Sequence, residues 1–265
     1  MKSEKFTLRI LKEEKKMKNK KLALCIIALI FVLILGGFLA YGYYQKATFK
    51  MTRPVVSMEI EGYGTVKMEL YPDMAPNTVK NFIKLVNEGY YNGLTFHRVE
   101  ESLIQGGDKA EDEAGETEYT IKGEFSANNY KENTLKFERG TVGLAREDYT
   151  YYSSIDASLT EEGYNSGYAQ FFIMAQNEDS FNGYYTAFGK IIEGIEIIDE
   201  ITKLETKTET DEETGETTQT TEPVNAPVIS NMTVDTFGVE YGDPEVKEKF
   251  DVNSFIMQKL YGISY

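Results

Sequence analysis

Short segments in which apolar and polar residues alternate fill most of the chain between residues 55 and 241. The segments "VVSMEI" (55–60) and "TVKMEL" (65–70) flank the turn "EGYG", and this pattern predicts a β-hairpin. Similar segments bounded by Gly, Asn and Asp predict further strands at 94–99, 119–125, 140–145, 170–175, 185–191 and 228–237. This part of the chain is therefore predicted to be mainly β.

Helical periodicity is confined to a few segments. Residues 71–91 carry Pro76 where a first turn would begin, Gly89 where a C-cap would lie, and an apolar stripe between them. The stripe consists of Val79, Phe82, Ile83 and Val86. A second short helix fits residues 194–203. Many short strands, few helices and no βαβ rhythm predict a closed antiparallel barrel or a sandwich.

A long apolar run precedes this region. Residues 22–44 contain no charge, and a helix of that length crosses a bilayer core of about 30 Å. Residues 1–21 carry nine Lys/Arg and three Glu, which predicts a cytoplasmic N-terminus and an extracytoplasmic remainder. A cleaved signal peptide is the alternative, because residues 40–42 offer small side chains, but the run exceeds the usual apolar length of a signal.

These patterns divide the chain into consecutive parts. A Tyr-rich stretch at about 146–168 and an acidic, Thr-rich stretch at about 206–223 are expected to be irregular insertions or surface hairpins. The predicted parts are a basic tail (1–21), a transmembrane anchor (22–44), a spacer (45–54), the main β domain (55–241) and a C-terminal tail with a helix (242–265).

Charge and composition exclude several classes of function. The net charge is −15 while residues 1–21 carry +6, so the rest carries −21 and would repel nucleic acid. A single cysteine, Cys25, excludes an intramolecular disulfide. One histidine and one cysteine leave only carboxylates as further ligands, so we predict no metal and no cofactor.

The lone histidine lies in "FHRVEESLIQGGD" (96–108), where His97, Arg98 and Gln105 are close together. A hydrolase could use His97 as base with Ser102 or Ser166 as nucleophile, but neither serine has a nucleophile-elbow pattern. The Gly-Gly-Asp triplet lacks the lysine of a phosphate-binding loop, and a tight turn explains it better. A structural role in the core is favoured for the histidine.

The order of several motifs carries a resemblance. "APNTVKNFIKLVNEGYYNGLTFHRV", "IQGGD", "GEF", "GTVGLAR", "AQFFIMA" and "YTAFGKIIEGIEIIDEI" follow one another along the chain. Together they resemble the cyclophilin family of peptidyl-prolyl cis-trans isomerases over residues 55 to about 240. The resemblance implies a closed eight-stranded antiparallel β-barrel capped by two helices. It also implies an outer-face groove for proline-containing polypeptides.

The resemblance also assigns roles to individual residues. The family's catalytic arginine falls on Arg98, and its groove glutamine falls on Gln105, whose amide can orient the guanidinium. The aromatic floor of the proline pocket falls on Phe172. The remaining substrate-binding positions fall on Leu103, Leu144, Ala145, Gln170, Phe181 and Tyr185.

Three departures from the family pattern affect the expected activity. The segment between Arg98 and Gln105 is one residue shorter than usual, and Ser102 stands near the position of a pocket phenylalanine. Arg146 replaces a groove asparagine. Ser180 replaces the tryptophan of cyclosporin-sensitive members, so weak or no cyclosporin binding is expected. The predicted function is isomerisation of X–Pro bonds in extracytoplasmic proteins, with a weakly active or inactive binding module at the cell surface as the alternative.

Overall fold

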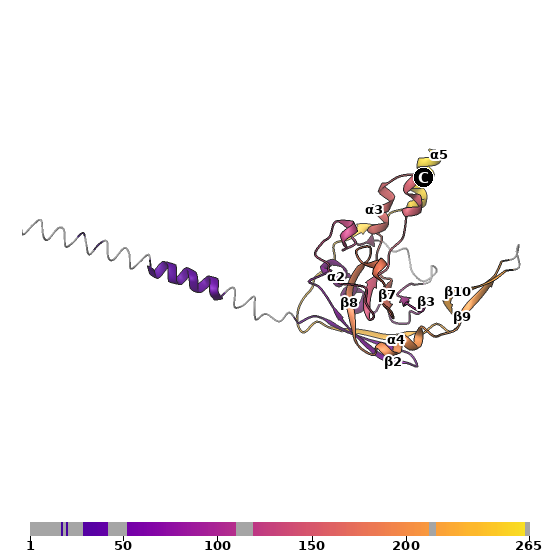
Figure 1. The fold of residues 1–265 in the computed structure, drawn as a ribbon, viewed down its shortest axis with the longest axis horizontal. Coiled ribbons are helices and arrows are strands. Elements are labelled where there is room, and N and C mark those ends of the chain that lie inside the picture. Colours follow the sequence, from indigo (N-terminus) through magenta and orange to yellow (C-terminus); the bar gives the residue numbers. More distant parts are fainter. Residues whose placement is uncertain are drawn as a thin grey trace, which may run out of the picture. The chain divides into compact units, whose positions relative to one another are not determined.

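The structure is a computed structural model in which two compact units, Met1–Met51 and Thr52–Tyr265, are distinguished (Figure 1). The described residues are 17, 20, 29–41, 52–109, 119–211 and 216–262. In the first unit, residues 29–41 are helical. No helix among the described residues combines the length and the apolar character needed to cross a membrane. Residues 22–28 and 42–44 of the predicted span lie outside the described part.

The predicted first hairpin is present in the second unit. Strands β1 (Val55–Ile60) and β2 (Gly64–Leu70) pair antiparallel, with Val56 opposite Met68 and Met58 opposite Val66. All four of these side chains are fully buried. The period of two in the sequence thus corresponds to one face of the hairpin that lies in the core.

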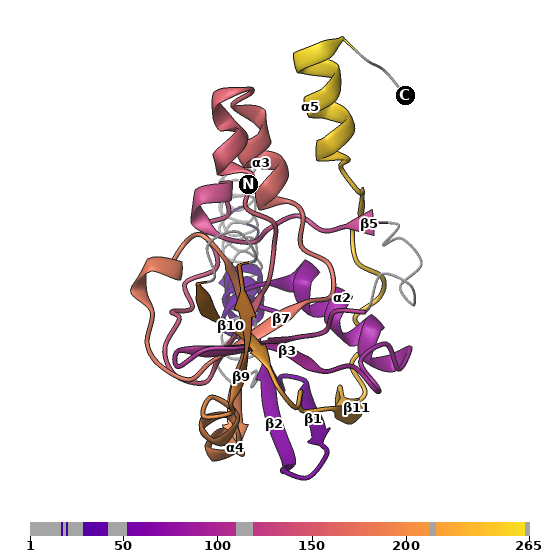
Figure 2. The same cartoon turned by 90° about the vertical axis from the view of Figure 1, so that its right-hand side faces the viewer.

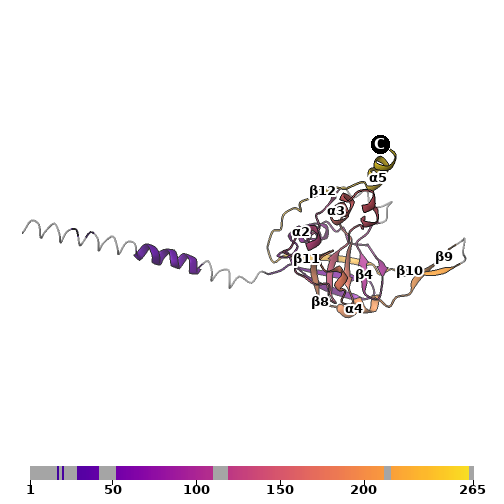
Figure 3. The same cartoon turned by 45° about the horizontal axis from the view of Figure 1, so that its top comes forward.

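The hairpin belongs to an antiparallel sheet of eight strands. Its order is β11-β1-β2-β8-β6-β7-β4-β3. The six further strands are β3 (Phe96–Val99), β4 (Leu103–Gly106), β6 (Thr141–Leu144), β7 (Phe171–Met174), β8 (Thr186–Glu193) and β11 (Ile229–Asp235). Figures 2 and 3 show these strands curling around a common interior.

The predicted closure of the barrel is wrong, because the sheet is open between its edge strands β3 and β11. Among the described residues, one isolated bridge, between Thr95 and Val228, connects the chain near these edges. The Phe96 N–H donates to the Pro227 carbonyl at 3.0 Å. Pro227 has no N–H to return, so the ladder cannot continue through it. The mainly β architecture and the eight strands agree with the prediction.

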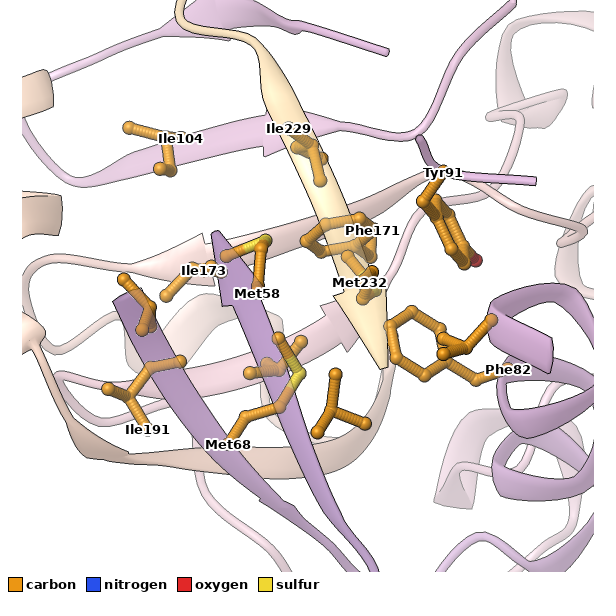
Figure 4. Packing of buried hydrophobic residues seen from close by; sticks show 14 of the residues in the cluster. Met58, Met68, Phe82, Tyr91, Ile104, Phe171, Ile173, Ile191, Ile229 and Met232 are labelled. Atoms are coloured by element: carbon orange, nitrogen blue, oxygen red, sulfur yellow. The ribbon is translucent and has the colours of Figure 1, made fainter. Parts of the chain in front are cut away.

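Two helices accompany the sheet, as expected. α2 (Pro76–Asn87) packs against β8 and β11, and α4 (Ile195–Ile201) packs against β2. Inside the curled sheet, the Phe82 ring of α2 lies 5.1, 5.6 and 5.0 Å from the rings of Tyr91, Phe171 and Phe188. Figure 4 shows Phe82 facing Met232 and Phe171 in this inner core.

The N-terminus of α2 is capped by a residue distant in sequence. The buried Glu124 carboxylate accepts hydrogen bonds from the Asn77 N–H at 3.0 Å, the Thr78 N–H at 2.8 Å and the Thr78 hydroxyl at 2.7 Å. These backbone donors have no partner within the helix. This role explains why the strand predicted at 119–125 forms only as β5 (Tyr119–Thr120): the chain turns toward the helix at Glu124.

The remaining elements lie outside the curled sheet. The 146–168 stretch, expected to be irregular, holds the 3₁₀ helix η2 (Thr150–Ser154) and the α-helix α3 (Ser158–Tyr164). The 206–223 stretch holds a hairpin that projects from the sheet in Figure 1, made of β9 (Thr206–Thr210) and β10 (Thr217–Pro223). The tail forms β12 (Lys247–Glu248) and α5 (Val252–Tyr261), and the other 3₁₀ helices are η1 (Ser126–Asn128) and η3 (Asp179–Phe181).

Candidate active site

Arg98 reaches the outer face of the sheet because β3 contains a bulge. Phe96 lies opposite Gly106 and Arg98 lies opposite Gln105, so the register shifts at His97. The side chains of Phe96 and Val99 are buried in the inner core. Simple alternation from Phe96 would place Arg98 in that core as well, and the bulge reverses the alternation by one residue.

Gln105 and Phe172 form, together with Arg98, a row of residues that crosses three neighbouring strands of the sheet. Gln105 pairs with Arg98 on one side and with Phe172 of β7 on the other. Directly opposite residues of antiparallel strands project from the same face. The catalytic pair expected from the sequence and the expected aromatic floor therefore occupy adjacent positions on the outer face.

A chain of hydrogen bonds links three polar side chains along this row. The Arg98 Nη1 group donates to Gln105 Oε1 at 3.1 Å, and Gln105 Nε2 donates to Gln170 Oε1 at 2.8 Å. Both ends of the Gln105 amide are engaged, and this fixes which atom accepts and which donates. The expected orientation of Arg98 by the Gln105 amide is present in the structure.

A second partner of Arg98 was not anticipated from the sequence. The Nε and Nη2 groups of Arg98 donate to Glu100 Oε1 at 2.8 and 2.5 Å. The two side chains are 42% and 32% exposed, so solvent reaches this ion pair. The spacing of two residues was the available signal, since residues i and i+2 of a strand share a face. Contacts between described residues engage three of the five guanidinium donors, and two remain for a ligand.

Phe172 is surrounded by aromatic rings on the outer face of the sheet. The Phe137 ring stacks on it at 5.5 Å, and the rings of Phe181 and Tyr185 approach it edge-on, each at 5.7 Å. Leu103 belongs to the same buried outer cluster. Phe172 is only 3% exposed, so its ring is largely covered in this state. Phe137 was missed in the sequence because it lies in a loop without periodicity.

The other predicted site residues are divided between two places. Leu144 is 4% exposed and lies in the inner core, on the face of the sheet opposite Phe172. Ala145 packs against the outer cluster. Arg146 lies over the Tyr185 ring at 4.5 Å and donates to the Tyr184 carbonyl at 3.0 Å. The structure therefore brings all predicted site side chains to the outer face except that of Leu144.

A cavity of about 500 Å³ opens beside the row of polar residues. Gln105, Ala145 and Gln170 line one side of it. Glu162 of α3 and Phe250 of the tail also line it. The volume lies within the range of about 300–1,000 Å³ that is usual for ligand sites.

His97 is held in a poorly solvated position within the bulge. Its Nδ1 atom is buried and has no hydrogen-bond partner among the described residues. Burial lowers the pKa of His97, and the nearby Arg98 lowers it further, while Asp108 and Glu222 oppose the shift. The hydroxyl of Ser166, the alternative nucleophile, donates to the Gly163 carbonyl at 2.7 Å and accepts from the Glu147 N–H at 2.8 Å. The Ser166 hydroxyl is thus engaged in structural hydrogen bonds, and His97 makes none with it.

This arrangement joins a fixed cation to an aromatic surface. A guanidinium with free donors can bind a carbonyl oxygen or a nitrogen lone pair. An aromatic cluster beside it can hold a small apolar ring. The site therefore suits a ligand in which an amide group adjoins a compact apolar ring, which describes a proline residue in a peptide.

Comparison with known proteins gives a consistent result. Residues 55–234 match the family model described as cyclophilin type peptidyl-prolyl cis-trans isomerase/CLD. Peptidyl-prolyl cis-trans isomerase B of Bacillus subtilis is 37% identical over 138 residues, which cover 52% of this chain and 82% of the relative. A probable peptidyl-prolyl cis-trans isomerase of Brucella suis is 34% identical over 178 residues, which cover 62% of this chain and 80% of the relative.

Solved structures show the same relationship. A cyclophilin type peptidyl-prolyl cis-trans isomerase of Cryptosporidium parvum superposes with a TM-score of 0.51 at 25% identity, covering 69% of this chain and 98% of that one. The same protein was crystallised in the presence of the dipeptide Ala-Pro, and that structure superposes with a TM-score of 0.50. The chain therefore belongs to the family of cyclophilin-type peptidyl-prolyl cis-trans isomerases, and it is an isomerase of X–Pro peptide bonds.

Proposed function

We propose that Arg98 is the catalytic residue and that a client proline binds against the outer aromatic cluster at Phe172. The observation that carries this proposal is the hydrogen-bonded row Arg98–Gln105–Gln170 beside Phe172. The row holds the guanidinium in one orientation on a rigid sheet. Preorganised donors of this kind contribute more to catalysis than donors that must reorient during the reaction.

The chemistry requires no nucleophile from the protein. An X–Pro bond resists rotation because the nitrogen lone pair is delocalised into the carbonyl, with a barrier of about 18–20 kcal/mol. Twisting the bond localises the lone pair on nitrogen. A guanidinium near that nitrogen stabilises the twisted state more than either planar state, which is the condition for catalysis.

Substitution of Arg98 tests this role. In the full chain purified in detergent, Arg98→Ala is expected to lower kcat/KM for an X–Pro peptide by about 10²–10³. Arg98→Lys should also lose most activity, because a point charge lacks the planar fork. Circular dichroism should show that both variants are folded, since Arg98 is partly solvated. Near-parental activity in a folded Arg98→Ala variant would exclude the proposed mechanism.

We also propose that the enzyme is tethered to a membrane and acts on proteins outside the cytoplasm. The uncharged run at 22–44 and the nine basic residues before it support this placement. Clients would be polypeptides that contain proline and fold near the extracytoplasmic surface of that membrane. The departure at Ser180, which is exposed on η3, supports weak or no binding of cyclosporin.

A binding module with little catalysis is a second candidate, and one observation favours it. Phe172 is only 3% exposed and is covered by Phe181 and Tyr185, while Ser102 stands near the expected pocket phenylalanine. Proline entry would then require these rings to move. Isomerisation kinetics and peptide binding measured on the same preparation separate the two: binding without rate enhancement would favour the module.

A further inference from the structure

The C-terminal tail contributes to the surface beside the active site, although it lies beyond the family match at residues 55–234. The Asn77 side chain donates to the Glu245 carbonyl at 2.8 Å and accepts from the Glu245 N–H at 2.7 Å. β12 then pairs with β5, Lys247 opposite Thr120 and Glu248 opposite Tyr119. The tail is thus fixed to the domain by backbone and side-chain bonds.

The tail and the 146–168 insertion also hold each other. Lys247 lies 3.4 Å from Glu162 of α3, and Lys259 of α5 lies 2.9 Å from Asp156. The Lys259 ammonium holds the pKa of the Asp156 carboxyl below its usual range, together with hydrogen bonds from Ser158. Figures 1 to 3 show α5 beside α3 in every view. The C-terminal tail and the 146–168 insertion therefore form one structure next to the cavity.

Phe250 is positioned by the start of α5. Asp251 is the N-cap, and its side chain accepts from the Ser254 N–H at 2.9 Å. Phe250 precedes the cap and Phe255 follows it by four residues, and their rings lie 5.3 Å apart. This pairing is a hydrophobic staple, which fixes the direction in which the chain enters a helix. The Phe250 ring is therefore held at the cavity and does not depend on the cavity for its placement.

The cavity is lined by aromatic rings rather than by charge of one sign. Tyr90, Tyr149, Tyr168 and Phe250 contribute rings. The charged side chains of the lining balance one another, with three acidic residues (Asp108, Glu147 and Glu162) and three basic ones (Lys109, Arg146 and Lys249). Such a lining favours an aromatic side chain, whose apolar faces and polar edge it can match, over a simple ion. Gln105 and Gln170 belong both to this lining and to the hydrogen-bonded row Arg98–Gln105–Gln170.

We propose that Phe250 determines client specificity by forming the wall of a subsite for an aromatic side chain near the X–Pro bond. In an extended peptide, a residue two or three positions from the proline lies about 7–10 Å away. Such a residue can reach the cavity while the proline lies at Phe172. The inference rests on the proposed placement of the client in this groove. It assigns to the tail a selective role that the isomerase reaction itself does not require.

Peptide selectivity of the full chain in detergent tests this inference. The peptides carry one proline and either Tyr or Ala, placed two or three residues before or after it. For at least one placement, the parent should prefer Tyr by about tenfold in kcat/KM. Phe250→Ala should reduce the ratio of kcat/KM for the Tyr peptide to that for the Ala peptide to about one, and Phe250→Leu should keep part of the preference.

Tyr261→Ala is the matched control. Tyr261 lies in the same tail, is 67% exposed and does not line the cavity, so this variant should keep the preference. No preference in the parent, or an unchanged preference in Phe250→Ala, would overturn the inference. If the parent isomerises none of the peptides, the proposed catalysis fails instead. Fluorescence anisotropy with the same peptides then decides whether binding still prefers Tyr and depends on Phe250.

Discussion

At the scale of single residues, the site depends on where one side chain points. The sequence motif places Arg98 next to His97, but only the bulge in β3 brings the guanidinium to the outer face beside Gln105. The resemblance could identify Arg98 without this information. Its partner Glu100 could not be identified that way, because the motif that carries the resemblance does not include it.

Glu100 is expected to position Arg98. Its Oε1 atom accepts from two donors of the guanidinium, and Gln105 accepts from a third. Glu100→Ala should free the Arg98 side chain to rotate and lower kcat/KM by about two- to fivefold, within the range of exposed ion pairs. Glu100→Gln keeps an acceptor oxygen and should retain most activity. The measurement is steady-state isomerisation of an X–Pro peptide.

Two controls separate this positioning effect from a general loss of structure. Glu101 is adjacent and exposed, so Glu101→Ala should retain parental activity. In an Arg98→Ala background, Glu100→Ala should have no further effect, because its partner is absent. A Glu100→Ala enzyme that is faster than the parent would contradict the prediction and would mean that the carboxylate weakens the cation.

His97 should make stability depend on pH. Burial and Arg98 lower its pKa in the folded state, so the unfolded chain binds a proton more readily. The stability contributed by neutral His97 is present above the unfolded pKa of about 6.5 and is lost as the pH falls below it. Between about pH 7.5 and pH 5, the parent should therefore lose more unfolding free energy than His97→Gln. Urea denaturation at both pH values measures this difference, and equal losses in the two proteins would contradict it.

At the scale of elements, the outer cluster requires a strand without a side chain at one position. A Cβ atom on Gly143 of β6 would lie 2.3 Å from the Phe172 ring and 2.7 Å from the Phe137 ring. Gly143→Ala should therefore displace Phe172, lower stability by about 1–3 kcal/mol and reduce kcat/KM. Thermal unfolding and isomerisation kinetics measure the two effects. Gly36→Ala, where an added Cβ atom would meet no described side chain outside the neighbouring residues within 4 Å, is the control that should change neither.

Elements defined by local patterns could be predicted from the sequence, and those defined by distant contacts could not. The first hairpin and α2 follow from alternation and from an apolar stripe, which reflect burial on one face. Residues 119–125 show strand propensity, yet Glu124 turns away to cap α2. No local sequence pattern predicts that a carboxylate will cap a helix more than thirty residues away in the chain.

The residues of the site likewise divide into those that the sequence identifies and those that depend on contacts between distant segments. Arg98, Gln105 and Phe172 come together because strand register aligns them. The family resemblance grouped Leu144 with them, but its side chain lies in the inner core. The stacking of Phe137 on Phe172 and the contribution of Phe250 depend on loops and on the tail. The geometry of these segments is set by tertiary contacts that carry no periodicity.

At the scale of the whole molecule, the distribution of charge distinguishes the two ends of the chain. Residues 1–21 carry a net charge of +6, and the remaining residues carry −21. An acidic body has no electrostatic attraction to an anionic membrane surface, so the N-terminal part is the region expected to contact lipid. The acidic charge also favours solubility of the isomerase domain over binding to nucleic acid.

This asymmetry leads to a prediction of topology. If residues 22–44 span the membrane with the basic residues inside, protease added to intact cells should digest the isomerase domain and spare the N-terminal tail. Tags placed before residue 2 and after residue 265 allow immunoblotting of the two ends, and permeabilised cells provide the control in which both ends become accessible. Mature protein that lacks the N-terminal tag would show that the apolar run is a cleaved signal. Protection of the C-terminal tag in intact cells would place the isomerase on the cytoplasmic side and would contradict the proposed extracytoplasmic role.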